Sequence, residues 1–289
     1  MQFNWTVTDE AISIKKFLAQ RDISHRLFAQ LKATTGALTV NGHSADPQIA
    51  LGVGDEVTVI LPPEPSDPNV PISHEPIELI DETANDLVVA KPAGLTVVPG
   101  PSNRTDTLVN RIKGRLADEN ATFMVPHILT RLDRDTSGLV LVAKHRLANS
   151  WYSQQATAGT LQKRYLAVVS GILADDHGLI DRPLRRAVDG FNQIVSPDGK
   201  PAQTEYWVRQ RGTTVTLVEV QLHTGRTHQI RAHFAAIGHP LLGDALYGGP
   251  LDQIDRQALH AYDLRFRDPL TDAERTYELP LPDDLQHLI

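Results

Sequence analysis

The segment from residue 130 to residue 144 reads Thr-Arg-Leu-Asp-Arg-Asp-Thr-Ser-Gly-Leu-Val-Leu-Val-Ala-Lys. Its apolar part, Leu139 to Ala143, predicts a buried or half-buried strand, and the Thr-Ser-Gly before it is typical of a turn that leads into such a strand. Asp133 lies between Arg131 and Arg134, whose charges favour an ionised carboxylate. Such a carboxylate suits a nucleophile or a base, although Arg-x-Asp-Arg runs are more often surface ion pairs.

Further strands and helices follow from the pattern of apolar residues on either side of this segment. We expect strands over the ranges Leu87–Ala90, Tyr165–Ser170, Thr204–Arg209 and Thr214–Leu222, with a hairpin at residues 211–213. We expect helices over the ranges Thr107–Leu116, Ala148–Ala156 and His228–Ile237. Strands without regular intervening helices favour an α+β domain with a mainly antiparallel, mixed sheet, which we place at residues 75–289.

The first 74 residues read as a separate module and a linker. Residues 12–20 and 24–33 show helical periodicity, with Ser24 as an N-cap, and the segments Leu38–Val40 and Val57–Leu61 read as strands. We therefore predict a small domain at residues 1–62. Residues 63–74 are rich in proline and carry no period, which predicts a semi-rigid linker.

Several motifs resemble those of RluA-type RNA pseudouridine synthases. The Arg-Leu-Asp-x-x-Thr-Ser-Gly of the opening segment is similar to the family's signature, although many members have His where this chain has Thr130. Three other segments match those of the family in the same order. They are Asp86–Leu95, which contains Lys-Pro-Ala-Gly, then Lys163–Ala167, and then His223–His233, which is followed by Gly238–Asp244. One such motif is weak evidence, but four in the right order make the resemblance strong.

The resemblance implies roles for particular residues. It places the catalytic carboxylate at Asp133, with Asp135 a less specific position, and the active-site tyrosine at Tyr165. It assigns the role of the active-site basic residue, which pairs with the carboxylate, to Arg226, with Arg231 as the fallback.

The N-terminal segment resembles the alpha-L RNA-binding module of ribosomal small-subunit protein four. That likeness implies contacts with RNA phosphates, although a helical hairpin with exposed lysines is often only solvated surface. The residues that we predict to bind RNA are Lys15, Lys16, Arg26, Lys32, Arg131, Arg134 and Arg231.

Composition excludes some classes of protein and leaves others open. The net charge of −7 argues against a nonspecific nucleic-acid binder, but the central segment is rich in arginine, so a basic face on an acidic body is compatible with the sequence.

We expect a cytoplasmic protein without membrane contact. The sequence has no cysteine, no apolar run near the roughly 18 residues of a membrane span and no signal-peptide pattern. The histidines between residues 223 and 239 lack the spacing of a metalloprotease helix, so we expect no metal. Monomer is the default oligomeric state.

The activity implied by the resemblance is the isomerisation of specific uridines to pseudouridine in structured RNA, without a cofactor. Large-subunit ribosomal RNA is the favoured substrate and transfer RNA the alternative. Two rivals stay open at this point. One is a noncatalytic RNA-binding protein of the same fold, and the other is a glycoside-type hydrolase that uses Asp133 and Asp135.

Overall fold

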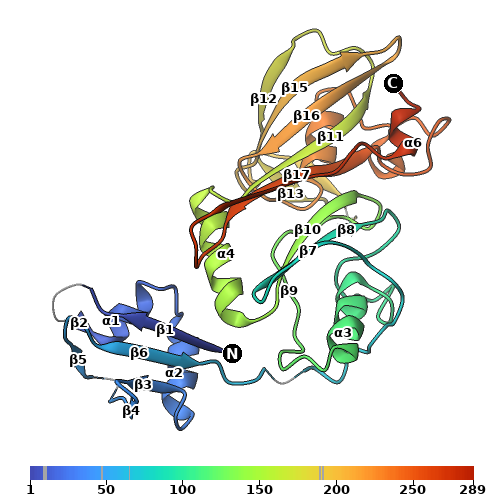
Figure 1. Ribbon diagram of the computed structural model, residues 1–289. Helices are drawn as coiled ribbons and strands as arrows, with labels where there is room; N and C mark the ends of the chain where they lie inside the picture. The colour runs from blue at the N-terminus through green and yellow to red at the C-terminus, as the bar shows by residue number, and fades with distance from the viewer. Residues whose placement is uncertain (9–11, 47, 65, 189, 191) are drawn as a thin grey trace.

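The computed structural model describes residues 1–8, 12–46, 48–64, 66–188, 190 and 192–289, and it is dominated by one large sheet. The strand order along the sheet is β12-β15-β16-β11-β17-β10-β8-β7, with β18 paired to β17 and β9 to β10 (Figure 1). The strands are β7 (Glu78–Glu82), β8 (Asp86–Lys91), β9 (His127–Ile128), β10 (Ser137–Ala143), β11 (Gln162–Ser170), β12 (His177–Asp181), β15 (Gln203–Arg211), β16 (Val215–Leu222), β17 (Leu259–Arg267) and β18 (Glu274–Glu278). A separate hairpin pairs β13 (Leu184–Arg186) with β14 (Gln193–Val195).

The predicted α+β class with a mainly antiparallel, mixed sheet is confirmed. Within this sheet β10 and β17 pair in parallel, and the other pairs described are antiparallel. The expected strands fall on β8, β10, β11, β15 and β16, and β15 and β16 form the expected hairpin. The expected helices correspond to α3 (Leu108–Asp118), α4 (Arg146–Ala158) and α5 (Gln229–Ala236). Two short elements, the 3-10 helix η1 (Ala245–Tyr247) and α6 (Asp283–Gln286), were not expected.

Local signals explain where the helices begin and end. A capping box starts α3, because the Thr107 hydroxyl and the Asn110 side chain each accept from the other residue's backbone N–H. His145 caps α4 by accepting from the N–H of Ala148, and Gly159 ends that helix in the left-handed conformation. In each of these helices the buried apolar residues lie on one face, which packs onto the sheet.

The parallel pair at the centre of the sheet depends on Gly138. This residue has a φ of +122°, and a Cβ atom at its position would lie 2.2 Å from the carbonyl oxygen of Ala261 in β17. Only glycine allows so close an approach of two backbones. Gly138, the second residue of β10, therefore fixes the start of this strand against β17, and with it the loop that carries Asp133.

The N-terminal segment forms a second, four-stranded sheet with two helices. Its strand order is β1 (Gln2–Thr6), β6 (Glu56–Ile60), β3 (Leu38–Val40) and β4 (His43–Ser44), and the bridge between β2 (Ile12–Ser13) and β5 (Ala50–Leu51) lies beside it. The helices are α1 (Ile14–Ala19) and α2 (His25–Ala33), and Ser24 caps α2 by accepting from the N–H of Leu27. The sequence patterns did not show β1.

This segment packs against α4 of the larger part (Figure 1). The indole N–H of Trp151 donates to the carbonyl oxygen of Arg21 at 3.0 Å, and the Ser150 hydroxyl donates to that of Asp22 at 2.7 Å. The Phe3 ring meets the Trp151 ring edge-on, with 5.5 Å between centroids. A shared apolar cluster therefore joins the two parts, while the domain boundary at residue 62 stays a prediction.

The proline-rich segment is held by hydrogen bonds to the helix α3. The Lys113 ammonium donates to the carbonyl oxygens of Asp67 and Val70, and the Asn110 amide donates to that of Pro71 at 2.7 Å. Residue 65 of the predicted linker lies outside the described residues. The remainder follows a fixed path over the surface, as expected of a stiff, proline-rich chain.

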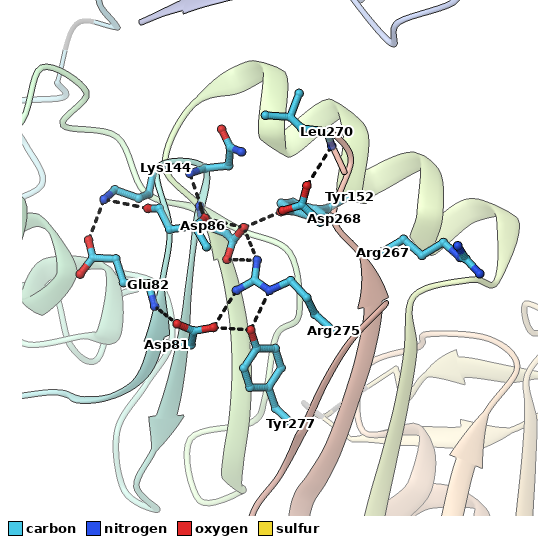
Figure 2. A network of polar contacts seen from close by, with 12 residues as sticks. Asp81, Glu82, Asp86, Lys144, Tyr152, Arg267, Asp268, Leu270, Arg275 and Tyr277 are labelled. Carbon is cyan, nitrogen blue, oxygen red and sulfur yellow. Dashed lines mark hydrogen bonds and ion pairs between the residues drawn. The ribbon is translucent and has the colours of Figure 1, made fainter. Parts of the chain in front are cut away.

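A buried ion-pair network ties β7 and β8 to the late strand β18 (Figure 2). Asp86 is fully buried and accepts two hydrogen bonds of 2.9 Å from the Arg275 guanidinium and one from the Tyr152 hydroxyl. The second guanidinium nitrogen of Arg275 donates to Asp81 at 3.0 Å, and Tyr277 also donates to Asp81. Burial opposes the charge of Arg275, but Asp86 and Tyr277 together outweigh that effect and raise the pKa of Arg275.

Candidate active site

Asp133 lies in the loop between β9 and β10, at the edge of a cavity. Its carboxylate is partly exposed, at 28%, and its Oδ2 atom accepts a hydrogen bond of 2.9 Å from NH1 of Arg231. Thr130, at the start of the loop, is buried and accepts the backbone N–H of Leu141 at 2.8 Å. The residue that replaces the family's usual histidine thus anchors the loop to β10.

Arg231 is oriented by a second carboxylate. Its Nε and NH2 atoms donate to the two oxygens of Asp244 at 2.6 and 2.8 Å, which leaves NH1 for Asp133. Both members of this pair are buried, with side-chain exposures of 8% and 1%. Burial opposes the positive charge, but Asp244 and then Asp133 raise the pKa of Arg231, so it stays protonated. A cation is therefore fixed against Asp133 at every accessible pH.

The expected pairing of Asp133 with Arg226 is wrong, and the fallback residue Arg231 takes that place. Arg226 is exposed, and its Nε donates to the carbonyl oxygen of Pro201 at 3.0 Å. Arg226 lies in the loop before α5. Arg231 is the third residue of that helix and, like Ile230, is one of its buried residues, which explains why it reaches Asp133. Arg226 nevertheless lines the same cavity as Asp133.

The charges that flank Asp133 in the sequence do not pair with it. Arg134 binds Asp135 instead, with Nε 2.9 Å from Oδ1, because adjacent side chains on this turn reach each other more easily. Arg131 is exposed. The cation that binds Asp133 is thus Arg231, almost a hundred positions later in the chain.

Tyr165 occupies β11 and is 5% exposed. It lines the same cavity and also belongs to an apolar cluster of the core. Burial, and secondarily the charge of Asp133, raise the pKa of Tyr165, so the phenol is neutral at physiological pH. A neutral aromatic ring beside the carboxylate offers a surface on which a base can stack.

The cavity has a volume of about 590 Å³ and brings together Asp133, Tyr165, Arg226 and Arg231. It is also lined by Arg131 and Arg134, while its apolar wall includes Val97, Leu132 and Leu222. Among the described residues, Asp135 is not part of the lining. This argues against a hydrolase that uses Asp133 and Asp135 as a pair across one substrate.

Three residues without an assigned role complete the site. His228, the N-cap of α5, has a φ of +51° and brings its Nε2 to 3.8 Å from Oδ2 of Asp133, and its Nδ1 lies 3.2 Å from the Tyr247 hydroxyl. Lys91, 1% exposed, donates three hydrogen bonds of 2.8 to 2.9 Å to carbonyl oxygens, including that of Arg134 in the Asp133 loop. A lysine at the end of a buried strand was a signal for such a role, whereas no sequence feature pointed to Tyr247.

The predicted RNA-binding residues of the N-terminal segment are accessible. Lys15, Lys16, Arg26 and Lys32 are exposed on or beside α1 and α2. Arg231 differs, because it is buried and bound to two carboxylates. Contact of the exposed residues with RNA stays a prediction.

The described residues contain no group of three or more histidine, aspartate or glutamate side chains arranged to hold a metal ion. No helix in the described part of the chain is long and apolar enough to cross a membrane.

The chain is similar to known proteins over most of its length. A family model described as RNA pseudouridylate synthase matches residues 85–236, more than half of the 289-residue chain. The chain is 37% identical to the uncharacterized RNA pseudouridine synthase YjbO of Bacillus subtilis, over 96% of this chain and 98% of that protein. It is 36% identical to the ribosomal large subunit pseudouridine synthase D of Nitrosomonas europaea, over 82% of this chain and 71% of that protein.

A solved structure agrees as well. The human RNA pseudouridylate synthase domain containing 1 superimposes with a TM-score of 0.60 and 26% sequence identity, covering 74% of this chain and 88% of that one. The matched region holds Asp133, Tyr165 and Arg231, which the fold brings to one cavity. The resemblance to RluA-type enzymes is confirmed, and the chain belongs to the RNA pseudouridylate synthase family as an RNA pseudouridine synthase.

Proposed function

We propose that this enzyme isomerises specific uridines of ribosomal RNA and that Asp133 is its catalytic carboxylate. Relatives named ribosomal large subunit pseudouridine synthase D support ribosomal RNA as the substrate. The observation that carries the role of Asp133 is its hydrogen bond with Arg231, which a buried Asp244 holds in place at the edge of the cavity. This hydrogen bond fixes the orientation of the carboxylate at the edge of the cavity.

The reaction needs no redox partner, because it only exchanges bonds within one nucleoside. The bond between N1 of uracil and C1′ of the sugar breaks, the base turns over, and a bond between C5 and C1′ forms. The proton on C5 leaves and N1 gains one, so the atoms balance without a cofactor. Asp133 takes part either by attacking C1′ or by removing the C2′ proton, and both routes require an ionised carboxylate beside the sugar.

The surrounding residues have complementary tasks in this proposal. The neutral ring of Tyr165 stacks on the uracil and limits its movement while the base turns. Arg226, which lines the cavity and is exposed, contacts the phosphate beside the target uridine. The uridine must leave its stack to reach the cavity, at a cost of a few kcal/mol.

The N-terminal segment, as an RNA-binding module, would offset part of that cost through its own contacts with RNA. Its exposed cations Lys15, Lys16, Arg26 and Lys32 would contact phosphates at a fixed distance from the site, because α4 holds the module in place.

The test is a map of pseudouridine in total RNA from a strain that lacks this protein. We expect one or more ribosomal sites to disappear and to return with the wild-type protein but not with Asp133→Asn, which removes the charge and keeps the shape. Asp135→Asn is the matched control, because it alters a carboxylate of the same turn that does not line the cavity, and it should restore the sites.

Restoration by Asp133→Asn would remove Asp133 from the catalytic role. A missing site in transfer RNA would overturn the choice of ribosomal RNA while leaving the reaction intact.

A further inference from the structure

Tyr247 connects the β13–β14 hairpin to the active site. It is the last residue of η1, three positions after Asp244, and its ring lies 5.1 Å from the Arg231 guanidinium and edge-on to the His228 ring. Its hydroxyl has two neighbours, the backbone N–H of Gln193 in β14 at 2.7 Å and Nδ1 of His228 at 3.2 Å. One oxygen thus touches both the hairpin and a residue of the cavity.

The two contacts of this hydroxyl determine where its proton goes. A backbone amide only donates, so the Tyr247 oxygen accepts from Gln193. Burial raises the pKa of Tyr247, which keeps its own proton, and that proton needs an acceptor. Within the described part of the chain, the acceptor in reach is Nδ1 of His228. An imidazole that accepts at Nδ1 carries its proton on Nε2.

His228 is held neutral in this position. Burial lowers the pKa of His228 and Arg231 lowers it further, against the opposing effects of Asp133 and Asp244. Its left-handed backbone conformation, with a φ of +51° and a ψ of +22°, is uncommon for a residue other than glycine and directs the ring into the cavity. The Nε2 atom of the ring is the one that faces Asp133, 3.8 Å from Oδ2.

Two nitrogen atoms face the same oxygen of Asp133. NH1 of Arg231 donates a hydrogen bond to Oδ2 at 2.9 Å, and Nε2 of His228 lies 3.8 Å from that atom, which is longer than a hydrogen bond. We propose that Tyr247 is a positioning residue, which fixes the tautomer of His228 so that its Nε2–H points at Oδ2 of Asp133. The partial positive charge of that N–H then reinforces the hydrogen bond from Arg231 and leaves Oδ1 for the reaction. This inference rests on Asp133 as the catalytic carboxylate.

The first experiment reads the tautomer directly in the full-length protein without RNA. In ¹⁵N spectra we expect His228 to carry its proton on Nε2 in the wild type and to become a mixture of both tautomers in Tyr247→Phe, which removes one oxygen and keeps the ring. His228→Asn identifies the signal among the 12 histidines, because asparagine tolerates the left-handed backbone. Tyr262→Phe is the control, since that hydroxyl binds Glu219 and lies outside the cavity lining.

The second experiment measures turnover of the target RNA. Tyr247→Phe should lower kcat about tenfold, as expected for the loss of one aligning hydrogen bond, and leave KM within about twofold of wild type. The double variant Tyr247→Phe with His228→Asn should be no more than about twofold slower than His228→Asn alone, because both changes break the same relay.

Clear results would overturn the proposal. An unchanged tautomer in Tyr247→Phe, an unchanged kcat, or losses that multiply in the double variant would each show that Tyr247 does not act through His228. These outcomes are distinct from a failure of the proposed function, which would appear as activity of Asp133→Asn.

Discussion

Replacement of Arg231 by methionine tests both the stability and the chemistry of the site. In the described part of the chain, Arg231 provides both hydrogen bonds that the Asp244 side chain accepts, at 2.6 and 2.8 Å, and the Asp244 carboxylate is 1% exposed. Removing one partner of a buried ion pair leaves an unpaired buried charge, which costs about 3–5 kcal/mol of unfolding free energy. For a chain of this size the midpoint of thermal unfolding should fall by roughly 5–10 °C.

A second change separates stability from catalysis. Arg231→Met combined with Asp244→Leu removes both charges and fills similar volume, and such replacements are often neutral for stability. We expect the double variant to recover most of the lost unfolding free energy and to remain as inactive as the single one, because Asp133 still lacks its partner. Arg231→Lys keeps the charge but lacks the planar fork that binds both oxygens of Asp244, so it should be intermediate in both properties.

The assays are urea denaturation at pH 7 and single-turnover pseudouridine formation. Wild-type stability in Arg231→Met would refute the account of Asp244 as a buried charge that depends on Arg231. Recovery of activity in the double variant would show that Arg231 supports the fold and not the chemistry at Asp133.

Two further predictions concern the fold. Arg275→Leu should lower the free energy of unfolding, measured by urea denaturation, by about 3–5 kcal/mol, because it leaves the fully buried Asp86 without this cation (Figure 2). Arg267→Leu is the control and should lower it by less than about 1 kcal/mol, since its partner Asp272 is 83% exposed. Burial lowers the pKa of His145 from 6.5 to about 4. Between these two pH values the unfolded chain binds a proton at His145 that the folded chain does not bind. The free energy of unfolding should therefore fall as the pH drops from 6.5 to 4. A pH slope in His145→Gln as steep as that of the wild type would contradict this assignment.

The sheet was predictable where local pattern and packing agree. The apolar run at Leu139 to Ala143 is buried along its whole length in β10, as its pattern indicated. The turn expected at Thr136 to Gly138 lies instead at Arg134 and Asp135, because Ser137 and Gly138 already pair with β17. The strand β1 was not predicted, although Phe3 and Trp5 alternate with the polar residues Gln2, Asn4 and Thr6 as in a half-buried strand. Its place is set by pairing with β6, more than fifty positions later, which no local window contains.

The site was predictable as a set of segments and not as a set of contacts. Arg226 and Arg231 have the same chemistry, and the choice between them depends on where α5 begins and how it crosses the sheet. Tyr247 gains its importance from His228 and Gln193, which approach it from two other segments. Such tertiary contacts are not encoded in spacing along the chain.

The position of β17 in the sheet has a consequence for the synthesis of this protein. This strand lies between β10 and β11, yet it begins at Leu259 and so is synthesised after both of them. Until then the half of the sheet that carries Asp133 and the half that carries Tyr165 and Arg231 have no strand to join them, and both expose an unpaired edge. We therefore expect a chain that stops before residue 259 to be inactive, although it contains Asp133, Tyr165 and Arg231.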